Sequence, residues 1–213
     1  MKTYMMAQYS DLWWEQRRGI PTCSEFDKII TSAKGELSKS AQKYASLLVA
    51  EKRCLSPNFF TNRPITRAMA AGTETEPKAR AWYAFHHDTR DVQQVGFVTN
   101  DSGTLGGSPD AVINMTADRT SCEGILELKC PQPDTHVGYL VDPEDLLADY
   151  RQQVHGHLVV SGCQWVELVS YCEGFEPVIC RVVPDAYTIK LAEALAGFLK
   201  MLEATAAKVR GDS

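Results

Sequence analysis

One short apolar segment, Gly124–Pro131 with the sequence GILELKCP, constrains the fold of this chain more than any other. Its branched and aliphatic residues are typical of a buried strand, yet Glu127 and Lys129 interrupt them. Because side chains alternate along a strand, these two charged groups point to one face, and Leu126 and Leu128 point to the other. An unpaired buried charge costs several kcal/mol, so the segment requires either a salt bridge on an edge strand or a metal site.

The rest of the chain predicts helices on both sides of a group of strands. Residues 1–90 contain three helical segments: SEFDKIITSA, which starts with Ser24 as a capping residue, KSAQKYASLLVAEKRC, and TRAMAAGTETEPKARAWYAFHHD, which Pro77 divides. Residues 91–130 predict a three-stranded meander formed by DVQQVGFVTN, PDAVINM and EGILELKC. A helix ending at Gly162, the strands QWVELVSYCEG and PVICRVV, and a long C-terminal helix follow.

This order of elements predicts an α/β protein with a mixed central β-sheet flanked by helices. We expect one domain over residues 1–213, with a helical N-terminal part at 1–90 and a sheet-containing core at 91–213. Seven scattered cysteines without a CxxC pair are typical of reduced thiols in a cytosolic protein. No apolar run approaches the roughly 18 residues that span a bilayer, so no membrane partner is expected.

Charge is distributed unevenly along the chain. The net charge is −5, but residues 1–90 hold fourteen Lys and Arg against nine Asp and Glu, whereas the remainder holds eight against eighteen. A basic N-terminal half favours a local phosphate-binding surface on an acidic protein. The lysines and arginines that are candidates for a DNA path, each also compatible with a solvated helix face, are Lys34, Lys39, Lys43, Lys52, Arg53 and Arg63.

A second acidic group lies upstream of the interrupted strand, in GGSPDAVI. Pro109 restricts the backbone just before Asp110, and the turn TADRTSC brings Asp110 and Glu127 toward each other at the ends of paired strands. Two carboxylates are hard oxygen ligands that suit Mg²⁺ or Mn²⁺ better than zinc. With Lys129 they form the pattern PD…ExK, which is compatible with metal-dependent phosphodiester hydrolysis or with a structural ion-pair network.

The segments around this motif resemble those of a known family. SPD and ELKCP, preceded by WWEQRRGIPTCSEF and by the spacing G-x-x-x-E-x-x-AR, resemble the phage lambda exonuclease family of viral recombinases, within the PD-(D/E)xK nuclease superfamily. The resemblance runs in order from about residue 12 to about residue 162. It implies a restriction-endonuclease-like PD-(D/E)xK core.

The resemblance also implies a metal site. Asp110, Glu127 and the carbonyl of Leu128 match the metal-binding groups, and Lys129 matches the catalytic lysine. Glu76 matches a helical glutamate that supports a second ion, and Glu74 is its alternative two residues away. Two Mg²⁺ ions, or Mn²⁺, are therefore expected.

Further positions match, or depart from, groups near the metals and at the DNA end. Gln153 and His155 lie where the family has Gln-x-Gln, so His155 is a departure that leaves metal ligation or hydrogen bonding to water open. Arg17 and Ser24 match groups that bind the 5′-phosphate. A helix beginning at Ser24 would attract an anion with its free N–H groups, and Arg17 would supply a bidentate charge, with Arg18 as the alternative.

We therefore expect a Mg²⁺-dependent 5′-to-3′ exonuclease that degrades one strand of linear duplex DNA from a 5′-phosphorylated end. The resemblance further implies a homotrimer, a single-strand annealing protein as recombination partner, and action in the cytosol of a bacterial host. The alternatives are a DNA endonuclease on the same fold and a non-catalytic module that binds DNA ends.

Overall fold

The computed structural model describes residues 1–31, 35–54, 67–88 and 90–210, and the side chains of 67–73 and 210 are not described. Two of the basic residues suggested for a DNA path, Lys34 and Arg63, therefore lie outside the described residues. Two sheets and their helices make up the fold. The elements in chain order are β1 (Lys2–Tyr4), α1 (Asp11–Arg17), the 3₁₀ helix η1 (Cys23–Lys28), α2 (Ala41–Arg53), α4 (Arg67–His86), β2 (Val92–Gln93), β3 (Phe97–Thr99), β4 (Gly106–Gly107), β5 (Ala111–Met115), β6 (Cys122–Lys129), α5 (Pro133–Val141), α6 (Pro143–Ser161), β7 (Trp165–Ser170), β8 (Val178–Val182) and α7 (Ala186–Arg210).

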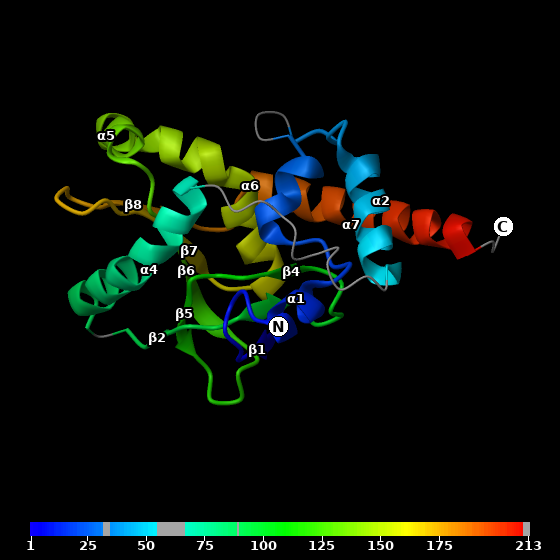
Figure 1. The fold of residues 1–213 in the computed structure, drawn as a ribbon, viewed down its shortest axis with the longest axis horizontal. Helices are drawn as coiled ribbons and strands as arrows, with labels where there is room; N and C mark the ends of the chain where they lie inside the picture. Colours follow the sequence, from blue (N-terminus) through cyan, green and yellow to red (C-terminus); the bar gives the residue numbers. More distant parts are fainter. Residues whose placement is uncertain (32–34, 55–66, 89, 211–213) are drawn as a thin grey trace.

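The larger sheet confirms the predicted mixed α/β architecture. Its five strands lie in the order β2-β5-β6-β7-β8, and β6 and β7 are parallel while the other pairs are antiparallel. A parallel pair needs a crossover connection, and α5 and α6 provide it between β6 and β7. Figure 1 shows α4 on one side of the strands, with α7 extending away from the sheet and crossing α2. The interrupted strand β6 is thus at the centre of the sheet and not at its edge.

Apolar side chains cover both faces of the sheet. On one face Ile125 belongs to a large cluster with residues of η1, α2, α6 and α7. On the other face Leu126 and Leu128 pack in a smaller cluster that includes Ala79 and Tyr83 of α4. All residues of β6 from Gly124 to Leu128 are buried. The alternation predicted for this strand therefore separates two buried faces, one aliphatic and one carrying the charged pair.

Three sequence predictions of local structure are wrong in detail. DVQQVGFVTN does not form one strand but two: β2 pairs with β5, whereas β3 pairs with β1 and β4 in a separate three-stranded sheet. A Cβ at Gly96, between them, would approach the carbonyl oxygen of Met6 to 2.4 Å, so the N-terminal segment packs directly on this point and captures β3. The same pairing places a strand, β1, within the first ninety residues, for which we predicted only helices. The helix α5 was not predicted.

A further difference concerns Ser24. The predicted helix at this position is a six-residue 3₁₀ helix, its N-cap is Thr22, and Ser24 is an exposed residue in its first turn. The end of α6 agrees with the prediction: its C-cap is Gly162, whose φ of +69° is the left-handed conformation that glycine adopts at low cost. Pro77 does not divide the helix as predicted, because α4 runs from Arg67 to His86 with Pro77 inside it.

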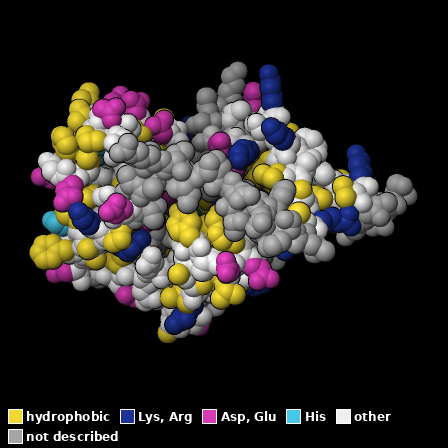
Figure 2. Space-filling view, viewed as in Figure 1, with side chains coloured by type: hydrophobic (Ala, Val, Ile, Leu, Met, Phe, Trp, Pro, Cys, Tyr) yellow, Lys and Arg dark blue, Asp and Glu magenta, His cyan; other side chains and the backbone are white. Residues whose placement is uncertain are grey.

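The charge asymmetry of the sequence is visible on the surface. On the face shown in Figure 2, Lys and Arg are more frequent toward the end formed by α2 and α7, and Asp and Glu toward the end formed by α5. Within the described part of the chain, no helix combines the length and the apolar character needed to cross a bilayer.

Candidate active site

The pairing of β5 with β6 brings the two predicted carboxylates together. Ala111 pairs with Leu126, and the backbone N–H of Asp110 donates to the carbonyl of Leu126 at 3.1 Å. Asp110 Oδ2 accepts a 2.6 Å hydrogen bond from the N–H of Leu128, which places this carboxylate beside the peptide that joins Glu127 to Leu128. Both carboxylates are buried, with 7% of Asp110 and 4% of Glu127 exposed.

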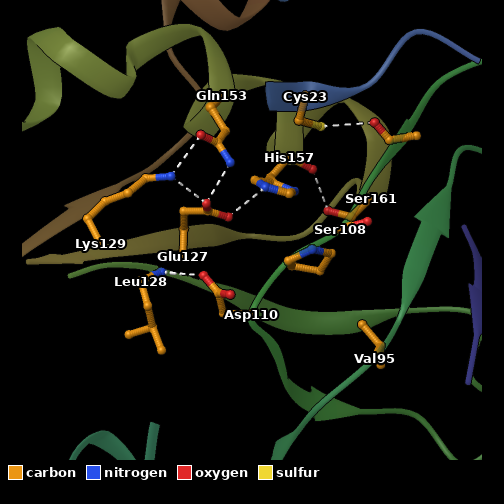
Figure 3. A network of polar contacts seen from close by, with 12 residues as sticks. Cys23, Val95, Ser108, Asp110, Glu127, Leu128, Lys129, Gln153, His157 and Ser161 are labelled. Carbon is orange, nitrogen blue, oxygen red and sulfur yellow. Dashed lines mark hydrogen bonds and ion pairs between the residues drawn. The ribbon is translucent and has the colours of Figure 1, made fainter. Parts of the chain in front are cut away.

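The Glu127 carboxylate is the centre of a hydrogen-bond network (Figure 3). Its Oε1 accepts bonds from Lys129 Nζ at 2.9 Å and from Gln153 Nε2 at 2.5 Å, and its Oε2 lies 3.0 Å from His157 Nε2. Lys129 Nζ also donates to Gln153 Oε1 at 3.0 Å. Burial opposes the charge on Glu127, but Lys129 and His157 outweigh it and lower the pKa of this carboxyl to about 2. On this face of β6, both oxygens of Glu127 therefore have hydrogen-bond partners, and two of these partners, Gln153 and His157, belong to α6.

The Asp110 side of the site has the opposite balance of charge. Burial raises the pKa of Asp110 well above its ordinary value, and the neighbouring carboxylates of Glu127 and Glu76 raise it further. Burial likewise raises the pKa of Glu76, and Glu127 adds to this while Arg80 and Lys129 oppose it. The charges of Glu76 and Glu127 both act on the buried Asp110 carboxyl, and a bound cation would relieve this excess of negative charge.

Glu76, and not Glu74, is the helical glutamate that faces this cluster. Glu76 is partly buried on α4 and its charge interacts with Glu127 and Lys129, whereas Glu74 is exposed. One turn after Glu76, Arg80 Nε donates to the carbonyl oxygen of Asp110 at 2.9 Å. This contact ties α4 to the loop that carries Asp110.

His155 lies away from the carboxylates. Its Nδ1 is 2.8 Å from Thr188 Oγ1, and its ring packs against Tyr187 on α7, so it faces the opposite side of α6 from Glu127. The physical reason is the helical period: Gln153 and His157 are four residues apart and share a face, whereas His155 is two residues from each. The prediction that His155 is a metal ligand is therefore not supported by its position, and we remove it from the site.

His157 is the site residue that the sequence reasoning missed. It is 1% exposed, and its contacts with Cys23 and Glu127 outweigh burial and raise the pKa of the imidazole well above its usual value. The i, i+4 spacing from Gln153 was the available signal.

Removing the His157 ring should destabilise the fold through Glu127. We expect His157→Ala to lower the free energy of unfolding by about 3 kcal/mol, because it leaves one oxygen of a buried carboxylate without its donor and opens a cavity. His157→Gln, which keeps a donor, should lose clearly less. Urea unfolding at pH 7 measures both variants, and equal losses would contradict this role for the Glu127 contact.

That difference should also depend on pH. The lowered pKa of Glu127 means that its ion-pair stabilisation is present above its ordinary pKa of 4.5 and is lost as the pH falls toward about 2. The gap between the two His157 variants should therefore narrow over this acidic range.

Arg17 lies beside the loop that leads into Asp110. Its Nη1 donates to Ser108 Oγ at 2.8 Å, its Nη2 approaches Thr22 Oγ1 at 3.3 Å, and its guanidinium stacks 4.2 Å from the Trp13 ring. It lines a pocket together with Thr22 and Tyr44, and Ser24 is not among the residues of that pocket.

Arg18, the alternative to Arg17, lines the same pocket, but its guanidinium is bound to a different element. Its Nε donates to the carbonyl oxygen of Glu51 at 2.6 Å, and its Nη2 donates to that of Cys54. Both acceptors belong to the end of α2, so Arg18 binds one helix end while Arg17 faces the candidate site.

The donor set fits a hard divalent cation in part. No three His, Cys, Asp or Glu side chains of the described residues form a ready-made ligand group. Asp110 and Glu127 nevertheless present two carboxylates beside one peptide, and burial together with the charges of Glu127 and Glu76 raises the pKa of Asp110. Carboxylate and carbonyl oxygens with open positions for water are the environment that Mg²⁺ prefers.

Comparison with solved structures identifies a similar overall fold. An alkaline exonuclease from Laribacter hongkongensis, LHK-Exo, matches with 26% identity and a TM-score of 0.72, over 95% of this chain and 97% of that one. Its complex with dAMP matches with 24% identity and a TM-score of 0.69, over 96% and 100% of the two chains. A phage-related exonuclease from Haemophilus somnus shares the fold at 14% identity and a TM-score of 0.63, over 89% and 96%. No curated protein matches the chain.

A family comparison agrees with these structures. The YqaJ-like viral recombinase domain matches residues 12–164, in nearly the same region as the resemblance noted from the motifs. The matches to this domain and to alkaline exonucleases confirm the resemblance to the lambda-exonuclease-like family. Since the matched region covers most of the 213 residues, this chain belongs to the family of YqaJ-like viral recombinase domains.

Proposed function

We propose that this protein is a Mg²⁺-dependent exonuclease that degrades one strand of linear duplex DNA in the 5′-to-3′ direction during recombination by strand annealing. The observation that carries the proposal is the buried cluster of Asp110, Glu127 and Lys129 on adjacent strands. The family and the solved relatives support the coarser conclusion that it is a nuclease: LHK-Exo is an alkaline exonuclease, and one of its structures holds dAMP, a deoxynucleotide.

Asp110, Glu127 and the carbonyl of Leu128 would hold the divalent ion, and Glu76 would support a second one. When bound, the metal supplies Lewis acidity at the phosphoryl oxygen and lowers the pKa of a bound water. The protein orients these donors: the Leu128 N–H holds Asp110 Oδ2, and Gln153 and His157 hold the two oxygens of Glu127. The carboxylates are thus positioned before any substrate arrives.

Lys129 is suited to hold positive charge at the reacting phosphate. Burial favours the neutral amine, but the Glu127 carboxylate outweighs burial and raises the pKa of Lys129. The ammonium therefore stays protonated at neutral pH and acts as a donor that orients water and stabilises developing negative charge. Gln153 Oε1, 3.0 Å from Nζ, restricts its position.

A digestion experiment tests the reaction. Linear duplex DNA carrying a label at one 5′ end, with either a 5′-phosphate or a 5′-hydroxyl, is incubated with Mg²⁺ or with EDTA. The expected result is release of labelled mononucleotides from the 5′-phosphorylated end, and none with EDTA. Cleavage of covalently closed circles would identify an endonuclease instead, and binding without any cleavage would identify an end-binding module.

Arg17 should account for recognition of the end. We expect Arg17→Ala to remove most of the preference for 5′-phosphate over 5′-hydroxyl, because its guanidinium is a charged fork bound to Ser108, on the loop that leads to Asp110. A loss of about 1.5–3 kcal/mol corresponds to roughly 10- to 150-fold in discrimination.

The neighbouring arginine serves as the control for that variant. Arg18→Ala should reduce thermal stability, since Arg18 binds the end of α2, but it should keep the discrimination. If Arg17→Ala discriminates as the wild type does, the end-binding site lies elsewhere. Ser24, exposed in a short 3₁₀ helix, has a smaller expected effect.

The assembly and its setting belong to the same proposal. A homotrimer and a single-strand annealing partner, acting in the cytosol of a bacterial host, are what the resemblance to the lambda exonuclease family implies. The mass of the protein in solution, measured by light scattering, checks the first of these. A monomeric mass at micromolar concentration would contradict the trimer without affecting the catalytic proposal.

A further inference from the structure

A groove of about 460 Å³ opens beside the Asp110 loop, between the N-terminal segment and the middle of α4. Its volume lies within the roughly 300–1,000 Å³ typical of ligand sites. One wall carries Met5 and Tyr9, and the other carries Glu76 and Arg80; Gln94, the residue after β2, also lines the groove. The groove therefore shares Glu76 with the candidate active site.

Both walls of the groove form hydrogen bonds with the backbone around Asp110. From the N-terminal wall, Gln8 Nε2 donates to the carbonyl of Pro109 at 3.0 Å and to that of Val95 at 3.3 Å. From the helical wall, Arg80 Nε donates to the carbonyl of Asp110 at 2.9 Å. A ligand in the groove is thereby held in a defined position relative to the carboxylates.

Tyr9 adds an independent observation. Its φ is +66°, in the left-handed region that bulky side chains rarely adopt, and its side chain is 52% exposed at the groove, beside Met5 at 47%. A strained backbone normally persists only where surrounding structure or function requires it. The turn around Tyr9 is closed by a 3.3 Å hydrogen bond from the N–H of Ser10 to the carbonyl of Ala7, and it leaves the ring exposed at the groove.

A row of three side chains relates this groove to the end-binding site. The rings of Tyr9 and Trp13 are 5.1 Å apart, and Arg17 stacks on Trp13 at 4.2 Å. Trp13 donates through Nε1 to Ser108 Oγ at 2.9 Å, so it packs against the loop that leads to Asp110. Tyr9 and Arg17 therefore stand at opposite ends of this row, with the loop beside its middle member.

We propose that the groove binds the nucleotide on the 3′ side of the scissile phosphate, with its base stacked on Tyr9. This inference rests on the proposed function, in which Arg17 takes the terminal 5′-phosphate and the carboxylates take the next phosphate. An exposed aromatic ring can stack on a nucleic-acid base, because every base offers a face for stacking, and Arg80 adds a positive charge to the same groove. A single unpaired nucleotide is the occupant that this groove fits.

A fluorescence experiment tests the groove without cleavage. Duplex DNA with a two-nucleotide 5′-phosphorylated overhang, whose second nucleotide is 2-aminopurine, is mixed with the protein in EDTA, and its fluorescence is compared with that of the free DNA. Stacking on Tyr9 should quench the 2-aminopurine in the wild type and in Tyr9→Phe, but not in Tyr9→Ala. Unquenched fluorescence in the wild type, or equal quenching in Tyr9→Ala, would overturn the proposal.

A second experiment compares the DNA affinity of the wild type and of Tyr9→Ala on intact and abasic strands. Tyr9→Ala should weaken binding of the intact strand about tenfold, within the range for base–aromatic stacking, and should leave binding unchanged when the second nucleotide is abasic. Equal weakening on both strands would show a merely structural role for Tyr9. Tyr9→Gly controls for a loss of stability. Glycine adopts a positive φ without strain, so this variant should unfold at the same or a higher temperature than the wild type and should still fail to quench the 2-aminopurine.

The two proposals fail separately. Quenching that depends on Tyr9, together with no release of nucleotides in Mg²⁺, would reject the exonuclease and retain the groove. Release of nucleotides together with unquenched 2-aminopurine would do the reverse.

Discussion

Lys129→Ala should reduce the rate of DNA cleavage by roughly 10²–10³-fold while leaving DNA binding nearly unchanged. The reason is that the Lys129 ammonium is a preorganised charge: Glu127 and Gln153 hold its Nζ at 2.9 and 3.0 Å. Groups of this kind, aimed at charge that develops in the transition state, contribute about 10²–10³-fold when removed singly. Single-turnover digestion of labelled duplex measures the rate, and fluorescence anisotropy measures binding.

Metal affinity separates this role from a structural one. Because Lys129 competes with a cation for Glu127, its removal should leave affinity for Mn²⁺ the same or higher in calorimetry. Lys200→Ala, at an exposed position on α7, is the matched control and should change neither quantity. A Lys129→Ala enzyme with full activity would refute the assignment, and one that fails to bind metal would indicate that the lysine only supports the fold.

The Asp110→Asn variant should be more stable than the wild type without metal and less stable than the wild type with Mn²⁺. Without metal, the buried Asp110 carboxylate is repelled by Glu127 and Glu76, so the neutral amide should raise the free energy of unfolding by on the order of 1 kcal/mol or more. With Mn²⁺ at a hundredfold excess over its Kd, the wild type should gain about 2.7 kcal/mol and the variant almost nothing. Cleavage should be lost.

Thermal unfolding in EDTA and in Mn²⁺ measures both parts of this prediction. Glu74→Gln provides the comparison, since Glu74 is an exposed glutamate on α4 two residues from Glu76 and should affect neither condition. A wild type that Mn²⁺ does not stabilise, or an Asp110→Asn variant that Mn²⁺ stabilises equally, would exclude Asp110 as a ligand.

Much of the core was predictable because its signals are local. The alternation in β6 predicted one aliphatic face and one charged face, and both were found. The long α7, the end of α6 at Gly162 and the strands β7 and β8 also follow from periodicity and capping. The small sheet was not predictable in the same way, because β1 and β3 pair across more than ninety residues and neither strand has a pattern of its own.

The site shows the same division between its residues. Asp110, Glu127 and Lys129 lie within one hairpin, so the spacing along the chain was enough to bring them together. His157 reaches Glu127 from a distant element, and the choice of His157 over His155 depends on the rotation of α6 against the sheet.

The sequence by itself determined that an acid and an amine would share the face of a buried strand, since alternation along the backbone admits no other arrangement. Only the tertiary structure decided which groups would meet them. Helix packing turned His157 and Gln153 toward Glu127 and His155 toward α7, because the rotation of a helix is set by its whole apolar face and not by any single residue.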